Sequence, residues 1–122
     1  MSETKQFRFE DLEIWKRSAD LSGLLFQLAD RLEERRRFRF AEQLRAATLS
    51  ITNNIAEGSG SHSDADFAHF LNISRRSVFE VANMIILLAR HGCLETGDTA
   101  SSINELAEIS RMLFAFRRTI KS

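Results

Sequence analysis

Residues Ser50–Phe67, which read SITNNIAEGSGSHSDADF, join two stretches whose apolar residues recur at helical spacing. A glycine that follows such a stretch is typical of the C′ position of a helix, where a positive φ strains glycine least. The pattern therefore predicts that Gly58 ends the first helix. Ser63 stands three residues before Asp66 in a weak form of the capping box, which predicts the start of the second helix there. We interpret the stretch as a corner between two helices.

A phosphate-binding loop is the alternative interpretation of this corner. Gly58 and Gly60 would let backbone N–H groups converge, and the N-terminus of the next helix offers further donors. However, the glycine spacing is neither that of a P-loop nor that of a dinucleotide-binding turn, and no lysine lies near it. The corner is therefore the stronger interpretation.

The rest of the chain continues the helical pattern. Its 122 residues include no proline and five glycines, and 43% are hydrophobic, which is enough to build one continuous core. Apolar residues at i, i+3 and i+4 spacing predict helices over residues 10–32, 38–57, 63–91 and 98–120. Four amphipathic helices with short connections predict a single domain, residues 1–122, with an all-α, antiparallel up-down four-helix bundle fold.

The third predicted helix carries more apolar residues than a monomer needs. Phe79, Met84, Ile86 and Leu87 lie off its main stripe, so the segment is apolar on nearly all sides. Such a helix is usually buried all round, whereas a helix of a monomeric bundle keeps one side in water. We therefore expect a homo-oligomer, and closed cyclic assemblies are the common form.

Asn54 and Glu57 lie in the last turn of the second predicted helix. A carboxylate at that end opposes the helix macrodipole and needs a cation or several donors nearby. Arg45 and Arg75 are candidate partners. We predict that Asn54, Glu57 and Arg75 form a structural polar network that fixes helix register or a subunit contact. A polar binding site at Asn54 and Glu57 is the alternative.

The histidines and the single cysteine do not indicate catalysis or metal binding. His62, Asp66 and His69 share an i, i+4, i+7 spacing that could hold a metal, but His62 precedes the predicted helix. Cys93, next to Gly92, is interpreted as a packing residue at a turn, and an unpaired cysteine suits a reducing cytoplasm. We expect no enzyme activity, no metal and no cofactor.

The sequence offers no segment that would direct the chain to a membrane. The N-terminal stretch MSETKQFRFEDLEIW is charged and lacks the apolar core of a signal peptide. The longest apolar stretch, VFEVANMIILLA, is interrupted by Glu80 and Asn83 and is too short to span a bilayer. We expect a cytoplasmic protein without a membrane partner.

The segment RRRFR, residues 35–39, is the densest basic cluster. Arginine pairs well with phosphate, and an aromatic ring such as that of Phe38 can stack on a base. Against this, 17 basic residues balance 17 acidic ones, so the chain lacks the net positive charge of a strongly cationic nucleic-acid binder. Glu33 and Glu34 also offset the cluster. The candidate nucleic-acid contacts are Arg35, Arg36, Arg37 and Arg39, with Arg45 as a weaker one.

Three segments, FEDLEIWKRSADL, EQLRAATLSITNNIAEG and DFAHFLNISRRSVFEV, follow one another along the chain. They resemble motifs of the four-helix-bundle proteins encoded in intervening sequences of 23S ribosomal RNA genes. These motifs are F-x-D-L-x-V-W, Q-[LI]-R-R-A-x-x-S-I-P-x-N-I-A-E-G and E-F-x-x-F-L-x-I-A-x-G-S-x-x-E-L. The resemblance extends from about Phe9 to Leu94. The chain departs from the motifs at Ala46, Thr52 and Arg76.

The resemblance implies an antiparallel four-helix bundle that assembles as a ring, a homopentamer. It also implies an architecture like that of the accessory proteins of diversity-generating retroelements, which are basic pentameric barrels associated with nucleic acid and a reverse transcriptase. Ala46 stands where the family has a second arginine, which weakens the implication of nucleic-acid binding.

Together, these observations predict a non-enzymatic, oligomeric helical-bundle protein that acts as a nucleic-acid- or ribonucleoprotein-associated binding module. The candidate partners are RNA, DNA or another protein. The alternative is a protein–protein interaction scaffold with no nucleic-acid role. Binding that ignores salt would indicate the scaffold, because phosphate contacts make affinity fall as salt rises.

Overall fold

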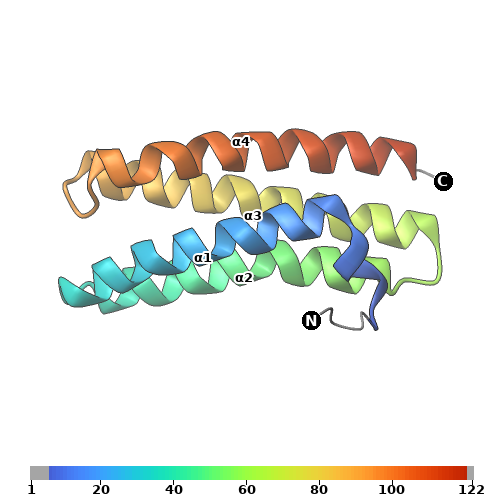
Figure 1. The fold of residues 1–122 in the computed structure, drawn as a ribbon, viewed down its shortest axis with the longest axis horizontal. Coiled ribbons are helices and arrows are strands. Elements are labelled where there is room, and N and C mark those ends of the chain that lie inside the picture. The colour runs from blue at the N-terminus through green and yellow to red at the C-terminus, as the bar shows by residue number, and fades with distance from the viewer. Residues whose placement is uncertain (1–5, 121–122) are drawn as a thin grey trace, which may run out of the picture.

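The computed structural model describes residues 6–120 and is all-α over that range. A short 3-10 turn, η1 (Arg8–Asp11), precedes four helices: α1 (Glu13–Glu34), α2 (Phe38–Ser59), α3 (Asp64–Arg90) and α4 (Thr96–Thr119). The helices lie alongside one another and successive ones run in opposite directions (Figure 1). Each packs against its neighbours in the chain, and α4 also packs against α1. The predicted antiparallel up-down four-helix bundle is confirmed.

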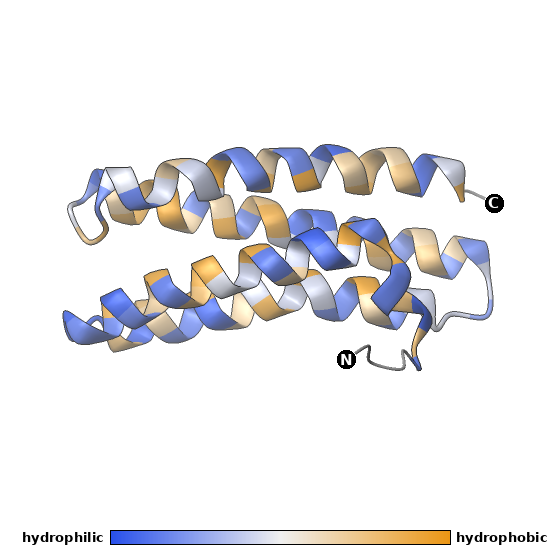
Figure 2. Ribbon diagram, in the orientation of Figure 1, coloured by the Kyte–Doolittle hydropathy of each residue, from blue (hydrophilic) through white to orange (hydrophobic). Residues whose placement is uncertain are grey.

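The core runs along the bundle and receives apolar side chains from every helix. Figure 2 shows apolar and polar bands alternating along each helix, as expected for helices that bury one stripe. The largest fully buried side chains include Leu25 and Leu32 of α1, Leu44 and Ile55 of α2, Leu71 and Ile85 of α3, and Leu106, Ile109 and Leu113 of α4. Within residues 6–120, no helix combines the length and the apolarity needed to cross a bilayer.

Both ends of α3 follow from its sequence. Ser63 is the N-cap, and its Oγ accepts a 3.1 Å hydrogen bond from the backbone N–H of Asp66. At the other end Gly92 has a φ of 78°, which turns the chain so that the Cys93 N–H reaches the carbonyl of Leu88 at 2.8 Å. This Schellman motif is the usual use of glycine after a helix.

The prediction that Gly58 ends the preceding helix is wrong. α2 continues through Gly58 to Ser59, and its C-cap is Gly60, with a φ of −91°. Gly58 is instead a contact point between two helices. A Cβ atom at this position would lie 2.8 Å from a ring carbon of Phe67 and 2.8 Å from the Cβ of Phe70. Because Gly58 has no side chain, the first turns of α3 can pack directly on α2.

Two helices begin at residues other than those predicted. α1 begins at Glu13 rather than at residue 10, since residues 8–11 form η1. The carboxylate of Glu10 accepts hydrogen bonds from the backbone N–H groups of Gln6 (3.1 Å) and Phe7 (3.0 Å). Leu12 has an extended backbone (φ −78°, ψ 127°), which separates this turn from the helix. α4 begins at Thr96 rather than at residue 98.

We predict that Gly58→Ala lowers the free energy of unfolding by about 1–3 kcal/mol, the range typical of overpacking. Gly23→Ala is the matched control, because a Cβ at this exposed position of α1 would meet no atom within 4 Å. It should raise the free energy of unfolding by up to about 1 kcal/mol through helix propensity alone. Urea unfolding at one fixed protein concentration measures both variants. A similar gain for both would contradict the contact role of Gly58.

Candidate functional site

Arg35 joins the two connections at one end of the bundle, here called the loop end, where α1 leads into α2 and α3 into α4. Its Nη1 donates hydrogen bonds to the backbone carbonyls of Gly92 (2.8 Å) and Cys93 (2.7 Å). These bonds tie the α1–α2 turn to the α3–α4 turn. Arg35, one of the predicted nucleic-acid contacts, therefore has a structural role in the protein.

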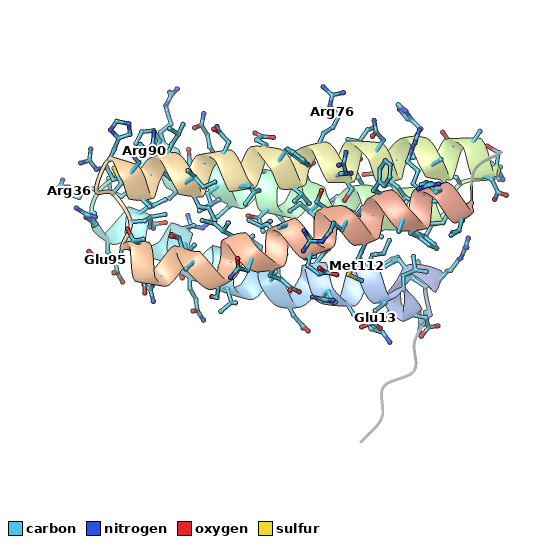
Figure 3. The ribbon with its side chains drawn as sticks, turned by 90° about the horizontal axis from the view of Figure 1, so that it is seen from above. Glu13, Arg36, Arg76, Arg90, Glu95 and Met112 are labelled. Atoms are coloured by element: carbon cyan, nitrogen blue, oxygen red, sulfur yellow. The ribbon has the colours of Figure 1, made fainter. Side chains whose placement is uncertain are left out.

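Arg36 follows α1 in a backbone conformation that favours glycine. Its φ is 64°, and its N–H donates to the carbonyl of Glu33 at 2.9 Å while the Arg37 N–H donates to that of Leu32 at 2.8 Å. This is a Schellman motif with an arginine at the C′ position, which carries a cost because of the Cβ atom. The motif directs the Arg36 side chain away from the bundle, and Figure 3 shows it at the extreme tip.

Arg45 is held by α1. Its guanidinium forms ion pairs with Asp30 and Glu33, each at 2.7 Å. Hydrogen bonds with Asp30 and then with Glu33 raise the pKa of Arg45 above its ordinary value. The side chain stays charged, but two carboxylates offset the charge. The structure thus places Arg45 in a contact between α1 and α2 rather than in an open basic surface.

Arg36, Arg37 and Arg39 remain available to solvent at the loop end. All three are exposed, and none of their side chains forms an ion pair or a hydrogen bond with another residue of the described range, 6–120. The ring of Phe38 between them is 54% exposed. The structure therefore brings three of the five predicted arginines into one open cluster with an aromatic ring.

Asn54 belongs to a line of hydrogen bonds between α2 and α3. Its Nδ2 donates to the carbonyl of Ser50 at 2.7 Å and to Ser50 Oγ at 3.0 Å. Ser50 Oγ in turn lies 2.8 Å from Ser77 Oγ of α3. Further along, Ser74 Oγ donates to the carbonyl of Ile51 at 2.7 Å. We call this line the serine seam. Sequence reasoning missed Ser74 and Ser77, although both fall on the buried stripe of α3.

Glu57 and Arg75 do not pair within the protomer, so the expected ion pair between them is wrong for a single copy. Glu57 is exposed, and its carboxylate has no partner among residues 6–120. The guanidinium carbon of Arg75 lies 5.1 Å from the ring centre of Phe79 and 5.2 Å from that of Phe114. Within the described chain its Nε is buried without a hydrogen-bond acceptor. A role for these residues in a subunit contact stays a prediction.

One flank of α3 forms an apolar and basic surface with α4, here called the α3–α4 face. It consists of Arg75, Phe79 and Ala82 of α3 and Ala107, Arg111 and Phe114 of α4. The rings of Phe79 and Phe114 are 57% and 46% exposed. Between the helices lies a hollow of about 300 Å³. Arg118 adds a cation 5.8 Å from the ring centre of Phe114.

The other flank of α3 forms a second apolar surface with α2, here called the α2–α3 groove. It consists of Phe40, Gln43 and Ala46 of α2 and Glu80, Met84 and Leu87 of α3. Leu87 is 45% exposed and Phe40 is 39% exposed. The deeper part of the groove has a volume of about 290 Å³ and reaches down to Cys93.

α3 is not apolar on every side, contrary to the expectation from its sequence. The exposed residues Arg76, Asn83 and Arg90 form a narrow polar strip along its outer side. Figure 3 shows Arg76 extending away from the other helices. The strip separates the α3–α4 face from the α2–α3 groove, so α3 carries two distinct apolar surfaces instead of one continuous surface.

The residues considered as metal ligands do not form a cluster. His62 lies in the bend before α3, the Asp66 backbone is engaged by the Ser63 cap, and the His69 ring packs at 5.9 Å against that of Phe70. No group of three histidine, cysteine or carboxylate side chains within residues 6–120 is arranged to hold a metal ion.

The chain is similar to known proteins over most of its length. The family model described as 23S rRNA-intervening sequence protein matches residues 10–115. A crystal structure of a protein with unknown function from the S23 ribosomal protein family of Bacteroides thetaiotaomicron has the same fold, with a TM-score of 0.81. The two chains are 26% identical, and the match covers 85% of this chain and 97% of the other. No curated protein matches the sequence.

Proposed function

Because the chain belongs to the 23S rRNA-intervening sequence protein family, we propose that it acts by binding, as an assembly of several copies of itself. The family match and the shared fold confirm the resemblance found in the sequence. The observation that carries the proposal is the exposed apolar surface on both flanks of α3. Apolar surface of this kind on a folded protein marks an interaction site.

The exposed side chains on these flanks are large. Phe79, Ile86 and Leu87 recur along α3, and Phe114 joins them from α4; each is between 44% and 57% exposed. Fully burying a side chain of this size stabilises a protein by about 1.5–3 kcal/mol relative to leaving it in water. Several such side chains on two surfaces favour a multi-copy assembly, which agrees with the homopentamer implied by the family resemblance.

We also propose that the protein is not an enzyme. The pKa shifts of Arg17, Arg45 and Glu108 arise first from a hydrogen bond with an oppositely charged side chain. Arg17 and Glu108 belong to one network of ion pairs on α1 and α4, and Arg45 belongs to a separate one between α1 and α2. Each shift arises from an ion pair at the surface, whereas catalytic groups with shifted pKa values gather at one site. A cytoplasmic location stays a prediction from the unpaired Cys93.

Nucleic-acid binding is the second candidate function, and the open cluster of Arg36, Arg37 and Arg39 favours it. Three unpaired cations around the exposed ring of Phe38 offer phosphate contacts and a stacking surface. In an assembly this cluster would be repeated, so that the positive fields of the copies add. The family name refers to an rRNA sequence, which makes RNA the first ligand to test. A protein scaffold without RNA binding is the alternative.

Self-association is tested by sedimentation of the full chain at micromolar concentration. We expect a species several times heavier than the 14.0 kDa chain. Self-association is favourable because it removes the two apolar flanks of α3 from water. A chain that remains monomeric across the micromolar range would contradict the proposal.

For RNA binding, we predict that replacing Arg36, Arg37 and Arg39 together by serine weakens retention of single-stranded RNA. Each lost phosphate contact should reduce the slope of log affinity against log salt by about 0.7. Arg35 is kept, because its bonds to the α3–α4 turn are structural. Filter retention measured from low to physiological salt gives both the affinity and the slope.

The matched control removes cations elsewhere on the surface. Lys16 and Arg76 are exposed and belong to α1 and to the middle of α3, so their replacement by serine should leave the slope almost unchanged. Retention that is equal in the wild type and in the triple variant would remove the cluster as the RNA contact. An equal loss in the control would show that only net charge matters.

A further inference from the structure

We propose that the α3–α4 face of one copy docks on the α2–α3 groove of the next copy, so that each contact joins two different surfaces. The inference rests on the self-association proposed above and names the partner of each flank of α3, which is the opposite flank of a second copy. A contact of this type is heterologous. It closes into a ring when the rotation between copies allows it.

The two surfaces carry charges of opposite sign. Arg75 and Arg118 lie on the α3–α4 face beside the ring of Phe114 and form no ion pair within residues 6–120, whereas Arg111 of the same face is paired with Glu108 at 2.8 Å. Glu80 lies on the rim of the α2–α3 groove, and Glu57 continues the same stripe of α2. Neither carboxylate has a partner within residues 6–120. Complementary charge on facing surfaces orients association and suppresses wrong pairings.

The same charges disfavour the pairing of each surface with its own copy. Two α3–α4 faces would bring the Arg75 and Arg118 cations of both copies together. Two α2–α3 grooves would bring the Glu57 and Glu80 carboxylates together. Like charges that meet across an interface oppose association. The arrangement that places cations opposite carboxylates is the one with two different surfaces.

Side-chain sizes on the two surfaces also match. The buried residues that line the hollow on the α3–α4 face are Val78, Leu106 and Ser110, and the small residues Ala82 and Ala107 lie at its sides. The α2–α3 groove instead has large side chains at its edge, namely Phe40 and Leu87, which project into solvent. A hollow of about 300 Å³ has room for such a side chain from the second copy.

Arg75 indicates that the α3–α4 face is incomplete in a single copy. Its guanidinium is held between Phe79 and Phe114, and its buried Nε has no acceptor within the described chain. Buried polar groups are normally hydrogen-bonded. A carboxylate from the groove of the second copy, Glu80 or Glu57, would balance the charge of the Arg75 guanidinium.

Mixing two variants of the full chain tests the proposal. The face variant carries Phe79→Asp and Phe114→Asp, and the groove variant carries Ala46→Asp and Leu87→Asp. All four positions are exposed, so both variants should fold, which far-UV circular dichroism checks. Each variant alone has one damaged surface and should sediment as a 14.0 kDa monomer. The mixture has one intact face and one intact groove and should form a one-to-one dimer and nothing larger.

The outcomes separate this inference from the proposed function. If the wild type assembles but the mixture stays monomeric, or if either variant assembles like the wild type, the pairing of these two surfaces is overturned while self-association stands. A monomeric wild type would overturn the proposed function itself. Leu24→Asp is the control, because Leu24 is 48% exposed on α1 and lies outside both surfaces. Its assembly should be intact, and its loss would also overturn the proposed pairing.

Discussion

At the Gly58 crossing, α3 packs so closely against α2 that a single added Cβ atom would lie 2.8 Å from two atoms of α3. The serine seam continues this close packing, with Ser74 Oγ bonded to the carbonyl of Ile51 and Ser77 Oγ to Ser50 Oγ. Ser50 and Gly58 of α2 and Ser74 and Ser77 of α3 are small, and at Gly58 the rings of Phe67 and Phe70 pack directly on α2. The larger side chains Phe79, Ile86 and Leu87 of α3 lie outside this contact and stay exposed on its two flanks.

Burial of the side chains on the two flanks would supply the free energy for association. Phe79, Phe114, Ile86 and Leu87 are each about half exposed, and full burial of one such side chain is worth about 1.5–3 kcal/mol. Association costs an estimated 4–15 kcal/mol in lost freedom of motion, so no single contact suffices. Several large side chains acting together, oriented by opposite charges, can overcome that cost. The arginines of the loop end have two different roles. Arg35 bonds the two turns together, while Arg36, Arg37 and Arg39 are exposed to solvent.

Sequence periodicity predicted the helices, the bundle and the Ser63 cap, because these depend on residues close together in the chain. The role of Gly58 could not be predicted, because a glycine near a helix end can form either a turn or a close contact. Which of the two occurs depends on the helix that packs against it. The positive φ of Arg36 could not be predicted, since arginine rarely adopts it. Arg75 was a candidate partner of Glu57 because a carboxylate in the last turn of a helix needs a cation, but in the structure the guanidinium of Arg75 lies against the rings of Phe79 and Phe114.

If a second copy covers the flanks of α3, hydroxyl-radical footprinting of the wild-type chain will detect the loss of exposure. As the protein concentration rises through the assembly transition, Phe79, Phe114 and Leu87 should lose reactivity together. Leu24 and Leu49, equally exposed on α1 and α2, should keep theirs. Flanks that stay as reactive as these two leucines at every concentration would contradict the account.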